Sequence, residues 1–441
     1  MQVHSHNLRT ARAHVIDVDM GYGHSRAAHN LKDLSRGEVV TANNYDGMPI
    51  AERELWRKWR EGYETLSRLR PVPIIGKIAF QIVEHAQTIP DFYPRRNLSQ
   101  PTLPLREAMH LIVKRGLGKH LVEALERRPL PAVCTHPIPA FSLETHGYKE
   151  PIWCVPTDAD VARAWVALEP KNSRIRYLCA NGRLIERLKR YGVSDDRLFL
   201  TGFPLPKELI GGIKQAVLKH DVSERLTRLD PQGVFFERYG KEVQRVFGKK
   251  KQLSSRPLTI TYAVGGAGAQ REIGKQILTS LERSLRRKEV RLILIAGTRR
   301  DVAEEYQRVA EHLGVHVPIV FSDNRATYFK RFNQALRETD ILWTKPSELA
   351  FYTALGLPII MAPPLGRQEE FNAIWLSYVG GGVHQEDPRY TNEWLFDWLN
   401  SGGLARAAWQ GYVQAPTHGT YRIEDLVLGR ESEWSPPPLI V

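Results

Sequence analysis

Residues 14–28 read His-Val-Ile-Asp-Val-Asp-Met-Gly-Tyr-Gly-His-Ser-Arg-Ala-Ala, and this stretch decides the fold class. The apolar run at 14–18 predicts a buried strand, and the small residues after His24 predict a helix. Between them, Gly21 and Gly23 allow a tight turn whose backbone N–H groups can approach a negative charge. A strand, a glycine turn and a helix in this order are typical of the start of a Rossmann-like α/β domain.

The alternation of apolar runs and helical patterns continues along the whole chain. Predicted strands lie at 14–18, 132–135, 152–155, 177–180, 198–201, 258–264, 290–296, 319–321, 341–343 and 359–362. Helical patterns between the strands predict parallel sheets covered by helices. A second glycine turn follows the strand at 258–264, so the pattern predicts two Rossmann-like domains whose parallel sheets face an interdomain cleft.

The composition suggests where these domains begin and end. Residues 207–252 are helical and strongly charged, and they end in the basic run Lys249–Lys251. We therefore predict a first domain at 1–206, a charged helical connector at 207–256 and a second domain at 257–390. Residues 391–441 are expected to form helices that return to the first domain and to end in a Pro-rich tail.

The charge balance favours an anionic partner. The 441 residues include 62 Lys and Arg against 49 Asp and Glu, a net charge of +13. Nucleic acid, an anionic membrane surface and phosphorylated substrates all fit this charge. Nucleic acid is not expected, because no RNA-binding, zinc-finger or helix-turn-helix signature is present.

The cysteines and the hydropathy pattern bear on location. Cys134, Cys154 and Cys179 are widely spaced in apolar settings, which predicts buried thiols in a reducing compartment and no metal site. No signal peptide and no run of 18 apolar residues is evident. We expect a cytoplasmic protein, peripheral at the inner face of the membrane in one interpretation.

The first glycine turn carries a candidate catalytic group. His24 stands at the start of the predicted helix, where open α/β sheets bind ligands, and an imidazole can accept a proton from a hydroxyl there. Gly21, Gly23 and Ser25 form the candidate phosphate or acceptor turn around it. The alternative is a helix-capping turn with an incidental histidine.

The second glycine turn is a candidate diphosphate cradle. Its members are Gly265, Gly266, Ala267 and Gly268. The turn has neither the GxGxxG spacing nor a following Gly-Lys-Ser/Thr, which disfavours a nicotinamide cofactor and ATP hydrolysis. The alternative is a tight turn that serves packing alone.

Polar residues follow two later strands at predicted helix starts. Amide and carboxylate groups in these positions can bind sugar hydroxyls. The candidate donor-binding residues are Lys345, Ser347, Glu348, Gln368, Glu369 and Asn372. Ordinary helix capping is the alternative for each residue taken alone.

Together these motifs resemble family 28 glycosyltransferases, which include monogalactosyldiacylglycerol synthase and the N-acetylglucosaminyltransferase that makes lipid II. The Gly-Tyr-Gly-His-Ser-Arg-Ala-Ala turn is similar to their glycine-rich histidine motif. Further matches follow in order over most of residues 13–385: Pro156-Thr-Asp158, Trp165, Tyr177–Asn181, Thr201-Gly-Phe-Pro-Leu-Pro206, Gly265-Gly-Ala-Gly268, Lys345-Pro346, Gly356-Leu-Pro358 and Gln368-Glu369…Asn372.

The resemblance implies a GT-B glycosyltransferase. Such an enzyme moves a sugar from a nucleotide-diphosphate donor to a hydroxyl acceptor, and we expect a membrane lipid as the acceptor. It implies that His24 activates the acceptor, that the Gly265–Gly268 turn faces the diphosphate, and that Gln368 and Glu369 contact the donor sugar. No metal and no separate cofactor are expected, since the nucleotide sugar enters as a substrate.

One departure from the family concerns the nucleotide. The family usually has a ribose-binding Glu five residues before the Gly of Gly-Leu-Pro, and this chain has Phe351 there. Glu348 is the candidate substitute. The usual uridine preference therefore does not follow from the sequence.

Two weaker signals remain open. Asp158-Ala-Asp160 imitates a metal-binding DxD motif, but its place after a strand fits the family's Thr-Asp better, so Asp158 is expected to shape the acceptor side or support His24. Residues 53–83 carry Trp56 and Trp59 among basic residues. They fit either a lipid-facing segment or an ordinary helix packed on its aromatic stripe.

Two rival functions stay open. A sugar-nucleotide epimerase of the GT-B type would share the diphosphate turn and need no acceptor. A basic, non-catalytic binding protein for nucleic acid or membrane would share the charge. The nucleotide base, the sugar, the acceptor, the anomeric outcome and the oligomeric state are not determined by the sequence.

Overall fold

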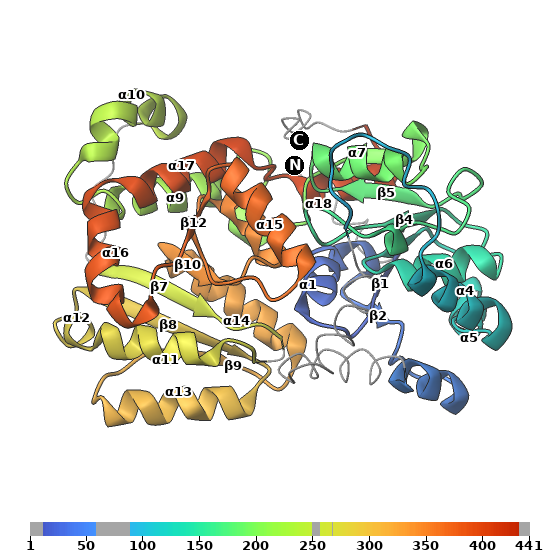
Figure 1. The fold of residues 1–441 in the computed structure, drawn as a ribbon, viewed down its shortest axis with the longest axis horizontal. Helices are drawn as coiled ribbons and strands as arrows, with labels where there is room; N and C mark the ends of the chain where they lie inside the picture. Colours follow the sequence, from blue (N-terminus) through green and yellow to red (C-terminus); the bar gives the residue numbers. More distant parts are fainter. Residues whose placement is uncertain (1–11, 59–88, 249–255, 267, 432–441) are drawn as a thin grey trace, which may run out of the picture. The chain divides into compact units, whose positions relative to one another are not determined.

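The chain forms two compact units, each built on its own parallel sheet (Figure 1). The computed structural model describes residues 12–58, 89–248, 256–266 and 268–431. Unit 1 comprises Met1–Pro204 and Gly419–Val441, and unit 2 comprises Leu205–His418. The predicted α/β class with two Rossmann-like sheets is confirmed.

The sheet of unit 1 has six parallel strands in the order β2-β1-β3-β4-β5-β6. The strands are β1 (His14–Asp17), β2 (Val39–Thr41), β3 (Ala132–Cys134), β4 (Ile152–Cys154), β5 (Arg176–Cys179) and β6 (Leu198–Leu200). The chain runs from β1 outward to β2 and then returns past β1 to β3. This reversal between β1 and β3 is the point where doubly wound sheets bind ligands, at the carboxyl ends of the strands.

Helices cover both faces of this sheet. They are α1 (Tyr22–Asn30), residues 50–58, α4 (Leu103–Arg115), α5 (Lys119–Glu126), α6 (Pro137–Thr145), α7 (Gly182–Arg190) and α18 (Gly419–Val427), with 3-10 turns η1 (Lys32–Ser35), η2 (Arg163–Trp165) and η3 (Asp195–Arg197). Neighbouring residues of β1 face opposite cores, because Val15 packs with α1 and α18 while Ile16 packs with α4, α5 and α6. Both faces are therefore apolar, as a covered parallel sheet requires.

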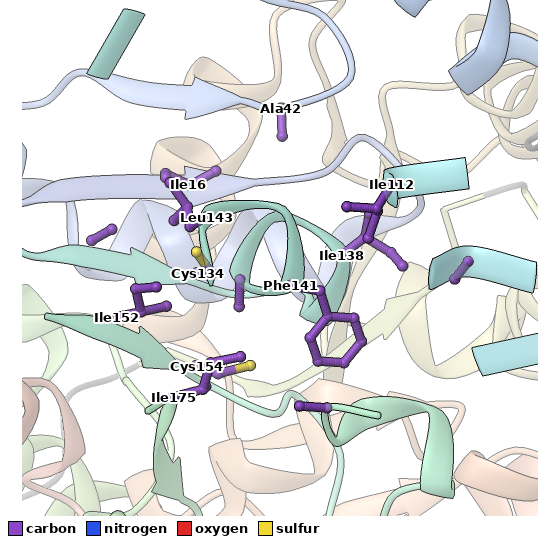
Figure 2. Packing of buried hydrophobic residues seen from close by; sticks show 14 of the residues in the cluster. Ile16, Ala42, Ile112, Cys134, Ile138, Phe141, Leu143, Ile152, Cys154 and Ile175 are labelled. Atoms are coloured by element: carbon purple, nitrogen blue, oxygen red, sulfur yellow. The ribbon is translucent and has the colours of Figure 1, made fainter. Parts of the chain in front are cut away.

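The larger core of unit 1 contains all three cysteines. Figure 2 shows Cys134 and Cys154 beside Ile16 from β1 and Phe141 from α6. All three thiols are free and buried, as the sequence predicted. Burial raises the pKa of each thiol, so the groups behave as small apolar side chains.

The sheet of unit 2 also has six parallel strands, in the order β12-β11-β10-β7-β8-β9. The strands are β7 (Leu258–Ala263), β8 (Val290–Gly297), β9 (Ile319–Phe321), β10 (Ile341–Thr344), β11 (Ile359–Met361) and β12 (Gly382–His384). This is the Rossmann order, in which the direction of winding reverses between β7 and β10. The carboxyl ends of β7 and β10 are thus the expected ligand position.

In unit 2, α11 and α13 lie on one side of the sheet, and α9 and α17 lie on the other (Figure 1). The helices are α8 (Lys207–Ile210), α9 (Ala216–Arg228), α10 (Val234–Phe247), α11 (Arg271–Ser280), α12 (Glu282–Arg286), α13 (Arg300–His312), α14 (Arg325–Glu338), α15 (Arg367–Tyr378), α16 (Thr391–Asn400) and α17 (Gly403–Gln414), with 3-10 segments η4 (Glu348–Leu355) and η5 (Pro388–Tyr390). Among the residues described, no helix has the length and apolar character needed to cross a bilayer.

All ten predicted strands are present, and each end lies within one residue of its predicted position. Two strands were missed, β2 and β12. Both are three-residue edge strands without three consecutive apolar residues, since β2 reads Val-Val-Thr and β12 reads Gly-Val-His.

The domain boundaries differ from the predicted ones. The predicted connector, 207–256, lies in unit 2, where Arg225 of α9 donates to the carbonyl oxygens of Thr339 at 2.9 Å and Leu355 at 2.7 Å. The basic run 249–251 and the tail 432–441 are outside the described residues.

The return to the first domain also begins later than predicted. It begins at Gly419 and not at 391, because α16 and α17 pack within unit 2. Gly419 fits tightly in unit 1, where a Cβ atom would lie 2.1 Å from the carbonyl oxygen of Phe203.

A buried ion pair fixes α7 to the loop that follows β4. Asp160 is fully buried, and its carboxylate accepts from Arg187 Nε at 2.8 Å, Arg187 Nη2 at 2.9 Å and Arg183 Nε at 3.0 Å. The side chain of Arg187 is fully buried too. The second Asp of the DxD-like motif is therefore part of the fold.

Replacing Asp160 with Ala should lower the free energy of unfolding by about 3–5 kcal/mol, because Arg187 would keep a buried charge without its partner. Urea unfolding measures the loss. Asp195→Ala is the matched control, since it breaks the exposed pair with Lys189 (3.2 Å) and should cost about 0–1 kcal/mol. Equal losses in the two variants would contradict a structural role for Asp160.

Candidate functional site

His24 lies at the reversal point of the unit 1 sheet. It stands in the first turn of α1, the helix that follows β1 after residues 18–21, and α1 begins after Gly21, whose φ of 104° suits a glycine. Residues from the end of the next strand, β3, reach the same place. The reversal between β1 and β3 therefore brings His24 beside Thr135 and His136.

One short hydrogen bond sets the protonation of the His24 ring. Its Nδ1 atom lies 2.6 Å from the carbonyl oxygen of Thr135 and 3.3 Å from Oγ1 of Thr157. A carbonyl oxygen can only accept, so Nδ1 carries the proton. In the neutral ring the lone pair is then on Nε2, which is the arrangement that a general base needs.

Two rings flank His24. The His136 ring meets it edge-on at 4.8 Å between centroids, and the Trp165 ring lies at 5.9 Å. Nδ1 of His136 accepts from the backbone N–H of Ile138 at 3.3 Å, at the start of α6. Burial holds the pKa of His136 well below its usual value, and protonation of nearby His24 would lower it further, so this ring is neutral at pH 7.

The other predicted residues of unit 1 lie around the same turn. Gly23 and Ser25 belong to α1, and Ser25 is buried. Asp158 directly follows Thr157, after the carboxyl end of β4, and is partly exposed. Its role, like that of Gly21, Gly23 and Ser25, stays a prediction.

His136 is a residue that the sequence reasoning did not single out. It follows β3 after one residue, Thr135, as His24 follows the turn after β1, so the signal was a polar aromatic residue at the carboxyl end of a predicted strand. The strand order that joins the two residues could not be known from the sequence.

The Gly265–Gly268 turn lies at the reversal point of unit 2, together with Lys345. The turn follows β7 and Lys345 follows β10, the neighbouring strand. A Cβ atom at Gly265 would lie 2.8 Å from Cε of Lys345, so the lysine side chain lies against this glycine. Gly268 has a φ of 71°, and its N–H closes the turn on the Gly265 carbonyl at 2.8 Å. Gly266 is half-buried, and Ala267 is outside the described residues.

Lys345 also connects the turn to α15. Its ammonium group forms an ion pair with Oε1 of Glu369. The other carboxylate oxygen of Glu369 accepts from the backbone N–H of Leu365 at 2.7 Å. Gln368 stands beside Glu369 in the first turn of α15 and is half-buried. A cation, a carboxylate and a glycine turn thus meet at the carboxyl edge of this sheet.

Three further predicted residues lie nearby in unit 2. Ser347 precedes η4, Glu348 is its buried first residue, and Asn372 is fully buried in α15. Phe351, at the position of the family's ribose-binding Glu, is a core residue whose ring lies 4.9 Å from that of Trp375. The roles of Ser347, Glu348 and Asn372 stay predictions.

Only the start of the segment 53–83 lies within the described residues. Trp56 is 4% exposed and packs in the large core of unit 1, which fits the interpretation of a helix packed on its aromatic side chains. Trp59 is outside the described residues. Membrane contact by this segment stays a prediction.

No family model matches the sequence, and no curated protein matches it. Among solved structures, S. aureus MnaA in a structure with UDP is 11% identical over 96% of this chain and 99% of that chain, with a TM-score of 0.48. UDP-GlcNAc 2-epimerase from Neisseria meningitidis bound to UDP-GlcNAc is 11% identical, covering 76% of this chain and 84% of that chain, with a TM-score of 0.42. The glycotransferase of kitacinnamycin is 13% identical, covering 95% and 98%, also with a TM-score of 0.42. These similarities are distant, so we derive the function from the site residues themselves.

The neutral state of His136 predicts a pH-dependent stability. In the unfolded chain the pKa returns to about 6.5, so below this pH the unfolded state binds a proton that the folded state excludes. The free energy of unfolding should therefore fall with decreasing pH, with His136 contributing up to about 1.4 kcal/mol per pH unit. Urea unfolding at pH 7 and pH 5.5 measures this slope. His136→Asn should flatten it, whereas His110→Asn, at an exposed position on α4, should not. A slope unchanged in His136→Asn would show that His136 is protonated in the fold.

Proposed function

We propose that this chain is a GT-B glycosyltransferase that moves a sugar from a nucleotide-diphosphate donor to a hydroxyl acceptor. The observation that carries the proposal is the hydrogen bond from His24 to the Thr135 carbonyl oxygen, which leaves Nε2 as a proton acceptor. Transfer to a hydroxyl needs such a base, whereas binding alone does not. The sequence resemblance to family 28 supports the same reaction.

The donor is expected in unit 2. A diphosphate is a strong anion, and the N–H groups of the Gly265–Gly268 turn, the start of α11 and the Lys345 ammonium are the groups of unit 2 suited to it. When the Lys345 ammonium group pairs with phosphate oxygens, Glu369 loses its ion-pair partner. Its carboxylate is then available, with Gln368, to accept hydrogen bonds from sugar hydroxyls.

The reaction uses these groups as follows. The acceptor hydroxyl gives its proton to Nε2 of His24 while its oxygen forms a bond to the anomeric carbon of the donor sugar. The bond between that carbon and the diphosphate oxygen breaks, and the nucleoside diphosphate leaves with the electron pair. Lys345 and the turn N–H groups stabilise the charge that develops on the leaving group.

The proposal also covers the acceptor and the cellular location. We propose a membrane lipid as the acceptor, in line with the resemblance, and a cytoplasmic enzyme that meets the inner face of the membrane. The net charge of +13 is compatible with an anionic surface.

His24→Ala should lower turnover by about 10²–10⁴-fold and leave donor affinity nearly unchanged, because the base acts on the acceptor. Release of nucleoside diphosphate in the presence of an acceptor measures turnover, and calorimetry measures donor binding. His29→Ala, on the same helix, is the matched control and should keep full activity. Normal turnover in His24→Ala would overturn the role of His24. Conversion of the sugar nucleotide without any acceptor would favour the epimerase alternative.

Binding measurements should distinguish the phosphate-binding role proposed for Lys345 from the sugar-binding role proposed for Glu369. Lys345→Met should weaken binding of the bare nucleoside diphosphate and of the sugar nucleotide alike, by about 10–100-fold, since it removes a charged hydrogen-bond donor to phosphate. Glu369→Gln should weaken binding of the sugar nucleotide more than that of the bare diphosphate. Lys330→Met, exposed on α14, is the control. Equal losses for both ligands in Glu369→Gln would contradict the assignment of Glu369 to the sugar.

A further inference from the structure

A cavity of about 440 Å³ opens in unit 1, away from His24. Its walls come from Trp153 of β4, Arg176 of β5, Phe199 of β6 and Leu426 of α18. Trp153, Phe199 and Leu426 all belong to the core between the sheet and α18. Arg176 is the first residue of β5, so the cavity lies toward the amino ends of the strands, whereas His24 lies beyond their carboxyl ends.

Three guanidinium groups line this cavity. Arg176 lies over the Trp153 ring with Cζ at 5.0 Å from the centroid, and Arg174 donates to the carbonyl oxygen of Lys149 at 3.2 Å. Among these three arginines, only Arg197 has a carboxylate of the described residues within ion-pair distance. Oδ2 of Asp196 lies 3.7 Å from Nε of Arg197. Three cations and one carboxylate give the lining a net charge of +2.

The guanidinium groups are the polar groups that a ligand in the cavity can reach. Arg174 and Arg176 are exposed, and Arg197 is partly exposed. Guanidinium groups donate hydrogen bonds in a geometry that matches phosphate and carboxylate oxygens. The cationic lining therefore indicates an anionic ligand with several acceptor oxygens.

We infer that this cavity is a second ligand site, which binds a small organic phosphomonoester. A phosphomonoester carries about −1.5 to −2 charges at pH 7 and three acceptor oxygens, which match the +2 lining and its three guanidinium groups. The volume of 440 Å³ suits a small molecule, and Phe199 and Leu426 offer an apolar wall to its organic part.

Because of the position of the cavity, a bound ligand would stabilise the packing of α18 on the sheet. It would contact both the sheet and α18, the helix through which the chain returns to unit 1 at Gly419. Binding should therefore hold α18 on the sheet and raise the thermal stability of the protein. The site is independent of the proposed reaction, since none of its lining residues belongs to the His24 or Lys345 clusters.

Calorimetry on the full chain with phenyl phosphate tests the inference. Arg197→Gln and Arg176→Gln should each weaken binding by about tenfold or more, because each removes a charged donor. Arg106→Gln is the matched control, because Arg106 is exposed on α4, which covers the other face of the sheet. Thermal unfolding of each variant verifies that it is folded.

Two further arms isolate the site. Benzyl alcohol, which has the ring without the phosphate, should not bind. Lys345→Met should bind phenyl phosphate as the unchanged protein does, so a failure of the proposed donor site would not alter this result. The inference is overturned if the unchanged protein does not bind phenyl phosphate at millimolar concentration. It is equally overturned if Arg197→Gln and Arg176→Gln bind as tightly as Arg106→Gln.

Discussion

The hydrogen bond between Nδ1 of His24 and the carbonyl oxygen of Thr135, at 2.6 Å, is the interaction on which the functional interpretation depends. It joins the helix after β1 to the loop after β3, and only a sheet that reverses its winding between these two strands brings them together. Because a backbone carbonyl cannot donate, the bond fixes the tautomer of the ring without any charged partner. Neutral His136 lies beside it, with its ring edge-on to that of His24.

In unit 2, too, the candidate ligand-binding groups lie where the strand order reverses, but these groups differ from those of unit 1. Its reversal, between β7 and β10, places a glycine turn against a lysine, and the lysine is paired with Glu369 from the helix after β11. Unit 1 thus offers a proton acceptor, and unit 2 offers a cation and backbone donors for an anion. A base for a hydroxyl and a cradle for a diphosphate leaving group are the two requirements of sugar transfer from a nucleotide donor.

The sequence predicted what is local and missed what depends on distant partners. Most of the ten predicted strands were found because they contain a run of at least three apolar residues, whereas β2 reads Val-Val-Thr and β12 reads Gly-Val-His. His24 was identified from its own turn, but His136 enters only through the strand order. In the sequence, Asp160 had no role beyond an imitation of a metal motif, because its partner, Arg187, lies 27 residues later. The helical pattern at 391–414 could not reveal which sheet those helices cover.

Nitrogen NMR of the histidine rings tests the central claim most directly. With 15N-labelled histidine, two-bond correlations distinguish a protonated from an unprotonated ring nitrogen, and the spectrum of His24→Gln identifies the His24 signals among the 15 histidines. At neutral pH we expect His24 to show a protonated Nδ1 and an unprotonated Nε2. A neutral ring with the proton on Nε2 would contradict the account, because the nitrogen assigned to accept the acceptor's proton would already carry one.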